Sequence, residues 1–309
     1  MTPRVFVVTY QFLSCGSVFT DGLHHAAEDL GLTYAHADWN TPHLPTLVQR
    51  FAPDLLFVVH GRKFSRQWQR PSLIVKCPSA VWLLDEPYEV DDTSTFSPRF
   101  DHVFLNDRAT LHRHPHSAYL PVCYDPHVQY AHDPRLERAH AVGFIGGGNP
   151  TRDRYLSALA HEGLLTYVVG GAWNDAAVNR LCISRNIPAR DTAVKYRQTR
   201  IVLNVFREKH HYNRQHIPAT ALNPRIYEAL ACGALVVSEW RPEVDEIVPE
   251  LPTFRSEAEL IPLVDGLLNE PDRAEAIRVQ CAARLAGHTY AARLQTVLDT
   301  ALGQREAVA

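Results

Sequence analysis

The sequence predicts an α/β protein of two Rossmann-like domains whose parallel sheets face a central cleft. Short β-branched runs alternate with helical patterns along the 309 residues, and a hydrophobic share of 46% supplies a large core. A polar segment with two prolines, near residues 125–140, divides the chain. Such alternation is typical of βαβ units, whose parallel sheets are covered on both faces. We therefore expect domains at residues 1–135 and 136–288, followed by a C-terminal helix at 289–309.

Five strand candidates precede the dividing segment and about four follow it. Each is a short apolar run of the kind that a buried parallel strand requires. In chain order they are Val5–Thr9, Thr33–Ala37, Leu55–Val59, Ala80–Leu84, His102–Leu105, Val142–Ile145, Tyr167–Val169, Ile201–Val205 and Leu235–Ser238. Between them lie helical patterns: Asp21–Leu30 carries an apolar stripe and stops at Gly31, and Ser256–Leu268 opens with a capping box formed by Ser256 and Glu259.

The bulk composition excludes several classes of protein. A net charge of −3 gives no global attraction for nucleic acid or an anionic membrane. The six cysteines form no CxxC pair, which favours buried thiols in a reducing compartment over disulfides or a zinc ribbon. No apolar stretch approaches the roughly 20 residues that span a bilayer. A strand starting by Val5 leaves no room for a signal peptide. These features predict a soluble protein of the cytoplasm.

The segment NPRIYEALACGALVVSEW, residues 223–240, predicts a short helix followed at once by a buried strand. Asn223 is a candidate cap, Pro224 suits the first helical position, and Gly233 suits a left-handed end. Arg225 and Glu228, three residues apart, share one helix face. A cation and a carboxylate near a helix N-terminus suit a ligand with phosphates and sugar hydroxyls, although an isolated pair of this kind is more often a surface salt bridge.

Three glycines, Gly146, Gly147 and Gly148, follow the strand that opens the second half. Thr151 is expected to cap the next helix, and Arg152 lies in its first turn, so the turn predicts an anion cradle. The pattern is no Walker A motif and lacks the third glycine of GxGxxG, and no acidic residue stands where an NAD ribose would need one. Hydride transfer is therefore disfavoured.

A long polar loop, residues 207–221, precedes the helix of residue 225 and contains Arg207 and Lys209. Positive groups leading into a helix N-terminus would complement a diphosphate. The loop also holds His210, His211 and His216, but these lack a matching carboxylate spacing. We therefore predict no metal and no cofactor.

In the first half, the exits of two strands carry polar groups. Gly16 and Ser17 offer backbone N–H groups to a phosphate, or form an ordinary βα turn. Asp85 ends the run WLLDEP at the carboxyl edge of the sheet, where ligands collect, and is the first candidate for a general base. His24 and Asp21 follow as further candidates, although His24 is better explained as a partly exposed structural histidine.

Several stretches together resemble the CgeB-type (spore maturation protein) glycosyltransferases of the GT-B superfamily. They are AVWLLDEP, FDHVFLND, AYLPVCYDP, GFIGGGNPTRDRYLSAL, IVLNVF, NPRIYEALACGALVV and the terminal GHTYAARLQTVL. The resemblance extends over nearly the whole chain. It implies a GT-B fold, a nucleotide-diphospho-sugar donor on the C-terminal half, an acceptor on the N-terminal half, and a last helix that crosses back to the first domain.

By position, Glu228 resembles the glutamate that binds the donor ribose, and Arg225 and Gly146–Gly148 resemble diphosphate contacts. Many retaining GT-B enzymes carry an earlier glutamate eight positions before this one, where the present chain has Thr220. The resemblance implies transfer from a UDP-, GDP- or TDP-sugar without a metal. The acceptor is a small molecule, a glycan or a protein, and less readily DNA. Two alternatives remain: a GT-B-type nucleotide-sugar epimerase, and a non-catalytic protein that binds nucleotide sugars.

Overall fold

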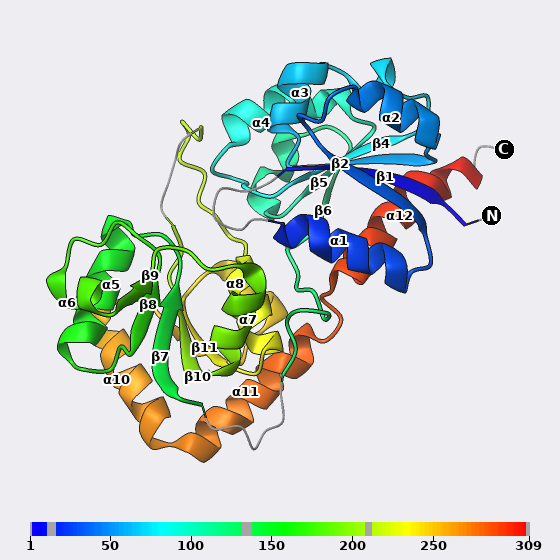
Figure 1. Cartoon of the computed structure of the whole chain (residues 1–309). Helices are drawn as coiled ribbons and strands as arrows, with labels where there is room; N and C mark the ends of the chain where they lie inside the picture. Colours follow the sequence, from blue (N-terminus) through cyan, green and yellow to red (C-terminus); the bar gives the residue numbers. More distant parts are fainter. Residues whose placement is uncertain (1, 11–16, 132–137, 208–211, 307–309) are drawn as a thin grey trace. The chain divides into compact units, whose positions relative to one another are not determined.

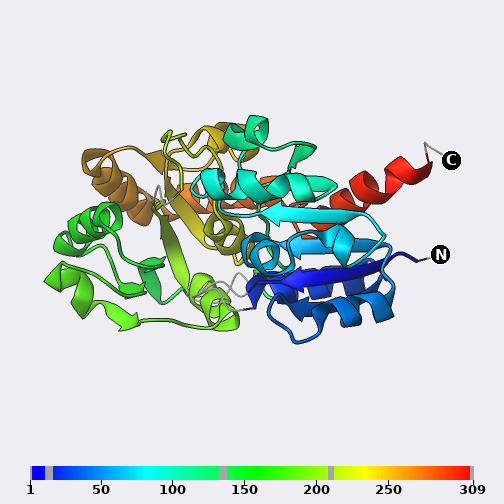
Figure 2. The ribbon, with the colours of Figure 1, turned by 90° about the horizontal axis from the view of Figure 1, so that it is seen from above.

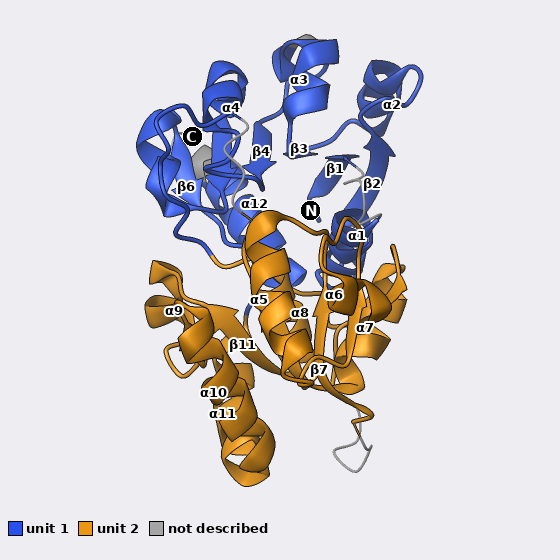
Figure 3. Ribbon diagram, turned by 90° about the vertical axis from the view of Figure 1, so that its left-hand side faces the viewer, with its two compact units in different colours: residues 1–123, 209–221, 288–309 blue, residues 124–208, 222–287 orange. Residues whose placement is uncertain are grey.

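The computed structural model describes residues 2–10, 17–131, 138–207 and 212–306. The chain divides into two compact units (Figure 3). Unit 1 contains residues 1–123, 209–221 and 288–309, and unit 2 contains residues 124–208 and 222–287. Each unit is built around its own parallel sheet of six strands. The α/β fold with two parallel sheets that the sequence predicts is therefore confirmed.

The sheet of unit 1 has the strand order β2-β1-β3-β4-β5-β6, with every neighbouring pair parallel. Its strands are β1 (Arg4–Thr9), β2 (Thr33–Asp38), β3 (Leu55–Val59), β4 (Ser79–Leu83), β5 (His102–Leu105) and β6 (Ser117–Tyr119). Its helices are α1 (Val18–Asp29), α2 (Leu44–Phe51), α3 (Arg62–Trp68), α4 (Val90–Phe96) and α12 (Tyr290–Glu306), with short 3-10 turns at Pro71–Leu73, Ser97–Arg99 and Arg108–Arg113. Apolar side chains from the strands and from the covering helices pack together in a hydrophobic core, among them Val58 of β3, Val81 of β4, Phe64 of α3 and Phe96 of α4.

The sheet of unit 2 has the order β12-β11-β10-β7-β8-β9, again all parallel. Its strands are β7 (His140–Ile145), β8 (Tyr167–Val169), β9 (Cys182–Ser184), β10 (Thr199–Asn204), β11 (Leu235–Glu239) and β12 (Thr253–Phe254). Its helices are α5 (Pro150–His161), α6 (Ala176–Arg180), α7 (Ala189–Arg197), α8 (Pro224–Ala231), α9 (Pro242–Ile247), α10 (Glu257–Asn269) and α11 (Pro271–Leu285). The strand order reverses at β7, with β10 on one side of it and β8 on the other.

All nine predicted strands are present, and β6, β9 and β12 are additional. These three are edge strands of two or three residues, and they lack the fully buried apolar run that marks the equally short β8. Ser256 caps α10 as predicted, because its side chain accepts a bond from the Glu259 N–H. The cap of α5 is Asn149, whose side chain accepts from the Arg152 N–H, and not Thr151 as expected. Pro150 takes the first helical position and moves the cap one residue earlier.

The last helix belongs to the first unit. In Figure 1, α12 lies beside α1, and it also contacts β3 and β4. The ring of Tyr290 stands edge-on to Phe19 and Trp82, with centroid separations of 6.2 and 6.4 Å. Figure 2 shows from above that β1 and α12, the elements nearest the two ends of the chain, are parts of one unit. Within the described residues, we find no helix with the length and apolar character that crossing a bilayer demands.

Gly22 lets α12 approach α1, and its replacement by alanine should destabilise unit 1. A Cβ at Gly22 would lie 2.5 Å from two ring carbons of Tyr290. Such overpacking costs about 1–3 kcal/mol, more than the roughly 0.5–1 kcal/mol that Gly→Ala gains in a helix. Chemical denaturation measures the change. Gly303→Ala is the matched control, because a Cβ at Gly303 in α12 meets open space. A higher unfolding midpoint for Gly22→Ala would contradict this account of the packing.

Candidate functional site

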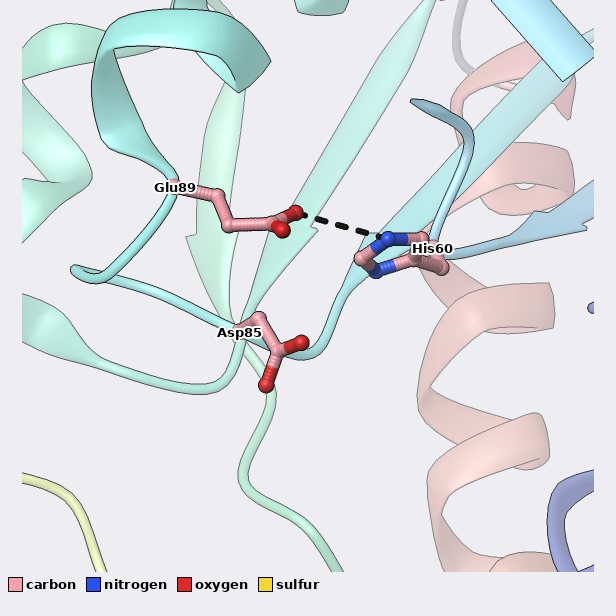
Figure 4. A group of neighbouring side chains, drawn as sticks. All are labelled: His60, Asp85 and Glu89. Atoms are coloured by element: carbon pink, nitrogen blue, oxygen red, sulfur yellow. Dashed lines mark ion pairs between the residues drawn. The ribbon is translucent and has the colours of Figure 1, made fainter. Parts of the chain in front are cut away.

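Three side chains of unit 1 meet where parallel strands end at the carboxyl edge of the sheet. His60 follows β3, Asp85 follows β4, and Glu89 lies in the turn before α4 (Figure 4). One side-chain nitrogen or oxygen of each lies within 4.8 Å of those of the other two. The His60 Nε2 atom is 3.4 Å from Glu89 Oε2. We call His60, Asp85 and Glu89 the unit 1 triad.

His60 is held in place by its backbone and by a neighbouring ring. Its φ angle is +63°, in the left-handed region, where a non-glycine residue costs of order 1–3 kcal/mol. Its N–H donates to the Trp82 carbonyl at 2.7 Å, and its ring stacks on Tyr10, with centroids 4.9 Å apart. The residue is only 4% exposed. Burial, and then the negative charge of Glu89, raise the pKa of Tyr10, so the stacked ring stays a neutral phenol.

Arg62, the first residue of α3, orients Glu89. Its Nη1 donates to Glu89 Oε1 at 2.8 Å, which leaves Oε2 as the oxygen that faces His60. Its Nε lies 2.6 Å from Asp92, and its guanidinium covers the Tyr212 ring at 4.3 Å. Burial opposes the charge of Arg62, but the hydrogen bond with Tyr212 and the two carboxylates outweigh it and raise the pKa of the guanidinium.

The other predicted residues of the first half lie on α1. Ser17 is the residue before the helix, and its hydroxyl bonds to the Asp21 carboxylate. His24 Nε2 is 3.4 Å from Glu28, and the His24 ring lies near Tyr34 in β2, with centroids 5.5 Å apart. Their contacts in α1 and β2 are therefore separate from those that fix the unit 1 triad. Gly16 lies outside the described residues.

The predicted basic loop divides between the units. Arg207 follows β10 and is half-buried, and Lys209 lies outside the described residues. Residues 212–221 belong to unit 1. There Tyr212 exchanges backbone bonds with Tyr88 and Asp91, at 3.0 and 2.8 Å. Arg214 of this loop donates its backbone N–H to the Asp91 carboxylate, so the loop lies beside the turn that carries Glu89.

Thr220, where GT-B enzymes often have glutamate, has a defined partner. The buried Asp107 carboxylate accepts the Thr220 N–H at 2.7 Å, its hydroxyl at 2.5 Å and the Ala221 N–H at 2.9 Å. A carboxylate accepting three such bonds fixes this backbone strongly. Thr220 therefore has a structural role: at the position where many retaining GT-B enzymes carry a glutamate, it fixes the loop to Asp107.

The glycine turn of unit 2 connects β7 to α5 and is tied to the loop after β8. The N–H of Gly146 donates to Val169, and the N–H of Gly148 donates to Gly171, both at 2.8 Å. A Cβ at Gly148 would lie 2.3 Å from the Ala172 carbonyl oxygen. Gly147 differs, because its Cβ position meets open space. The close packing therefore explains why residue 148 is a glycine. Gly147 has open space beside it and remains the predicted contact for a ligand.

Two arginines brace this turn. Arg152 in α5 donates Nε to the Val205 carbonyl at 3.0 Å and Nη1 to the Gly147 carbonyl at 2.8 Å. Arg225 in α8 donates Nε and Nη2 to the Ile145 carbonyl, at 3.0 and 2.5 Å, and its guanidinium lies 4.8 Å from the Phe144 ring centre. The sequence assigns both arginines to the same anion site as the glycine turn. In the structure Arg152 bonds to Gly147 in the turn, and Arg225 bonds to Ile145 directly before it.

Asn204, at the end of β10, links strand, helix and arginine. Its Oδ1 accepts from Arg225 Nη1 at 2.6 Å and from Asn223 Nδ2 at 2.8 Å, and its Nδ2 donates to Ser238 in β11 at 2.9 Å. Asn223 occupies the cap position of α8, but its side chain makes no capping bond and binds Asn204 instead. Gly233 closes α8 with φ +82°, as predicted.

Glu228 lies in α8, one turn after Arg225, and is half-buried. Burial raises its pKa to about 7, and the positive charge of Arg225 opposes the increase. Its charge in turn adds to burial in raising the pKa of Tyr196, a buried residue of α7. The ordinary pKa of a glutamate is 4.5, so Glu228, with a pKa of about 7, changes its charge near neutral pH instead of in acid. Such displaced titration is common where ligands bind.

Of the side chains in these two groups, the sequence singles out Asp85, Arg225 and Glu228 but not His60 or Asn204. The available signal was the same in both cases, a polar residue at or directly after the end of an apolar strand. His60 directly follows Leu55–Val59, and Asn204 ends β10, one residue before the end of the expected strand Ile201–Val205. The strand-exit rule that selected Asp85 would have selected both.

Comparison with known proteins finds one similar family for the second half and similar folds for the whole chain. A family model described as "Glycosyl transferase-like" matches residues 152–299. These residues span most of unit 2 and the first part of α12. No curated protein matches the chain.

Solved structures of GT-B glycosyltransferases share the fold at low sequence identity. AviGT4, a glycosyltransferase involved in avilamycin A biosynthesis, is 14% identical with a TM-score of 0.64, and 96% of each chain is covered. A UDP-forming α,α-trehalose-phosphate synthase from Burkholderia vietnamiensis is 11% identical with a TM-score of 0.66 over the full length of both chains. An α-glucosyltransferase in complex with UDP and DNA is 12% identical with a TM-score of 0.67, covering 96% of this chain and 98% of that one. The chain therefore has a GT-B fold, and its residues 152–299 are similar to the glycosyl transferase-like family.

Proposed function

We propose that this chain is a CgeB-type glycosyltransferase that moves a sugar from a UDP-, GDP- or TDP-sugar to an acceptor hydroxyl. The observation that supports the proposal most is the assembly around Arg225. One guanidinium joins the glycine turn, the end of β10 and the start of α8, with a titrating carboxyl group one turn along the helix. In this proposal unit 2 binds the donor and unit 1 binds the acceptor.

The diphosphate would bind at the glycine turn of unit 2. The first turn of α5 and Gly147 would supply N–H groups, and Arg152, Arg207 and Arg225 positive charge. The three bonds from Arg225 to Ile145 and Asn204 use three of its five N–H groups, which leaves two for phosphate oxygens. With positive groups and a helix N-terminus on the leaving diphosphate, its departure requires no metal at that position.

The ribose would bind Glu228. A carboxylate accepts hydrogen bonds from a pair of sugar hydroxyls, and such charge-assisted bonds are among the stronger ones in proteins. Asn223 supports the same site indirectly, since its bond to Asn204 fixes the first turn of α8. Gly16, Ser17 and Lys209 stay in the proposal as predicted ligand contacts from the sequence.

In the transfer step, an acceptor oxygen bonds to the anomeric carbon while the bond from that carbon to the diphosphate breaks. If the configuration inverts, Asp85 takes the proton of the acceptor hydroxyl, with His24 and Asp21 as further candidates. If the configuration is retained, the leaving phosphate takes the proton and no protein base is required. In both cases the diphosphate leaves with the electron pair of the broken bond.

A panel of nucleoside diphosphates and their sugars tests the proposal by thermal shift. A ligand at 100 times its Kd stabilises the native state by about 2.7 kcal/mol, so the correct nucleotide should raise the unfolding midpoint by several degrees. We expect one of UDP, GDP and TDP to exceed the others and its sugar to be consumed when an acceptor is present. A panel in which no nucleotide raises the midpoint would contradict the donor assignment.

The unit 1 triad also favours an epimerase as the second candidate. Epimerisation of a nucleotide sugar needs carboxylate and histidine groups around the sugar, and the triad provides both. An epimerase would convert its nucleotide sugar with no acceptor added. A non-catalytic binding protein would show the midpoint shift with neither conversion nor transfer.

A further inference from the structure

We propose that the unit 1 triad of His60, Asp85 and Glu89 binds a divalent ion of the first transition row. The inference departs from the sequence-based prediction of no metal, because the three side chains form a group only in the folded chain. It concerns ion binding by unit 1 and does not depend on the proposed transfer reaction. It differs from the diphosphate site, whose described residues belong to unit 2.

The triad has the geometry of a three-ligand site. Because its three donor atoms lie within 4.8 Å of one another, some point is within about 2.8 Å of all three, against the 2.0–2.2 Å of Zn²⁺ bonds to nitrogen and oxygen. Small side-chain rotations would close the difference. Figure 4 shows the His60 ring, after β3, facing the carboxyl groups of Asp85 and Glu89, which both lie on the loop between β4 and α4.

Neighbouring residues hold the side chains of the triad in fixed orientations, as the residues around a metal site do. Arg62 holds Glu89 through Oε1 and leaves Oε2 toward His60, and the Tyr10 ring fixes the plane of the imidazole. Outer hydrogen bonds of this kind orient ligating groups in metal sites. A fixed set loses less entropy on binding an ion than flexible surface acids do.

The local charge favours a cation. The three carboxylates of Asp85, Glu89 and Asp92 outnumber the half-buried guanidinium of Arg62, with which two of them pair. A further cation, Arg66, reaches Asp92 at 3.7 Å, but its side chain is 58% exposed and therefore screened by water. A bound dication would offset the remaining negative charge.

The donor atoms select the class of ion. Mg²⁺ and Ca²⁺ prefer oxygen ligands alone, whereas an imidazole nitrogen with two carboxylates suits Zn²⁺, Mn²⁺, Fe²⁺ or Co²⁺. Three protein ligands leave positions open for water or for a substrate oxygen. His60, Asp85 and Glu89 would hold the ion, and a bound ion would supply Lewis-acid chemistry to an oxygen in such a position.

Titration of metal-free protein with Co²⁺, followed by visible absorption, tests the site, with Zn²⁺ as competitor. We expect one ion per chain and displacement by Zn²⁺. His60→Asn, Asp85→Asn and Glu89→Gln should each weaken binding by about tenfold or more. Asparagine is chosen at residue 60 because it tolerates a left-handed backbone. His161→Ala is the matched control, since His161 pairs with Asp175 at 3.1 Å on the surface of unit 2 and should leave binding unchanged.

The chain has 17 histidines, so the variants decide where an ion binds. Saturable binding that survives all three triad substitutions, or no binding at 100 µM Co²⁺ (about 100 times a micromolar Kd), would overturn the proposal. Should His60→Asn fail to fold, Asp85→Asn and Glu89→Gln keep the test valid, because both conserve side-chain shape. Ion binding without any nucleotide binding would refute the proposed function alone, and nucleotide binding without ion binding would refute this inference alone.

Discussion

Replacing Asp85 by asparagine should lower the rate of sugar transfer by about 10²- to 10⁴-fold, the usual contribution of a general base. The reason is that the amide cannot accept the proton of the acceptor hydroxyl. Donor binding should be unchanged, because Asp85 is not among the predicted donor contacts, and those assigned to the diphosphate and ribose around Arg225 and Glu228 belong to unit 2. Transfer is measured by release of nucleoside diphosphate at saturating donor, and donor affinity by calorimetry.

The control for this variant is Asp29→Asn, an exposed acid at the end of α1. The anomeric configuration of the product should be determined in the same experiment. An inverted product together with a large loss of rate supports Asp85 as the base. A variant within about tenfold of the wild-type rate, or a product with retained configuration, would remove Asp85 from that role.

Replacing Glu228 by glutamine should weaken nucleotide binding by about 10- to 100-fold, since hydrogen bonds to a charged group are each worth about 1.5–3 kcal/mol. Because the pKa of Glu228 is about 7, nucleotide affinity should also depend on pH near neutrality. Ribose hydroxyls donate to the ionised carboxylate, so binding favours loss of the proton. Wild-type affinity should therefore rise about tenfold from pH 6 to pH 8, whereas Glu228→Gln should be flat.

Stability should change in the opposite direction. Because the folded pKa of Glu228 lies above its ordinary value of 4.5, the unfolded chain gives up this proton more readily. The ligand-free protein therefore loses stability as pH rises from about 4.5 to about 7, and Glu228→Gln should lack this component. Glu162→Gln, at an exposed glutamate that ends α5, is the control. Equal affinities of wild type and Glu228→Gln at pH 8 would take Glu228 out of the nucleotide site.

The sequence was sufficient for the fold because local signals and tertiary structure agree. Buried parallel strands read as short apolar runs, so nine of them were found, while β6, β9 and β12 lack a fully buried apolar run. The prediction that Gly233 ends α8 is also confirmed, since a left-handed backbone is required there. The prediction that Asn223 caps α8 with its side chain is wrong, because that side chain bonds to Asn204, 19 residues away on β10, instead of to the nearby helix N–H groups.

The candidate site was only partly predictable for a related reason. Asp85 was selected because it follows a recognisable strand, but its neighbours His60 and Glu89 become a group only when β3 and β4 pair. Likewise the sequence links the positive groups of the 207–221 loop to a diphosphate, but it gives no sign of the bonds that residues 212–221 make to Tyr88, Asp91 and Asp107 within unit 1. Long-range partners of this kind leave no local pattern.

The position of α12 has a consequence for how the chain matures on the ribosome. Tyr290 covers Phe19 and Trp82, so unit 1 is completed by a helix that is synthesised only after unit 2. The nascent strands of unit 1 would wait through the synthesis of the whole of unit 2 with apolar side chains uncovered, a state that invites chaperone binding. A stop codon placed directly before Tyr290 should accordingly impair the folding of unit 1.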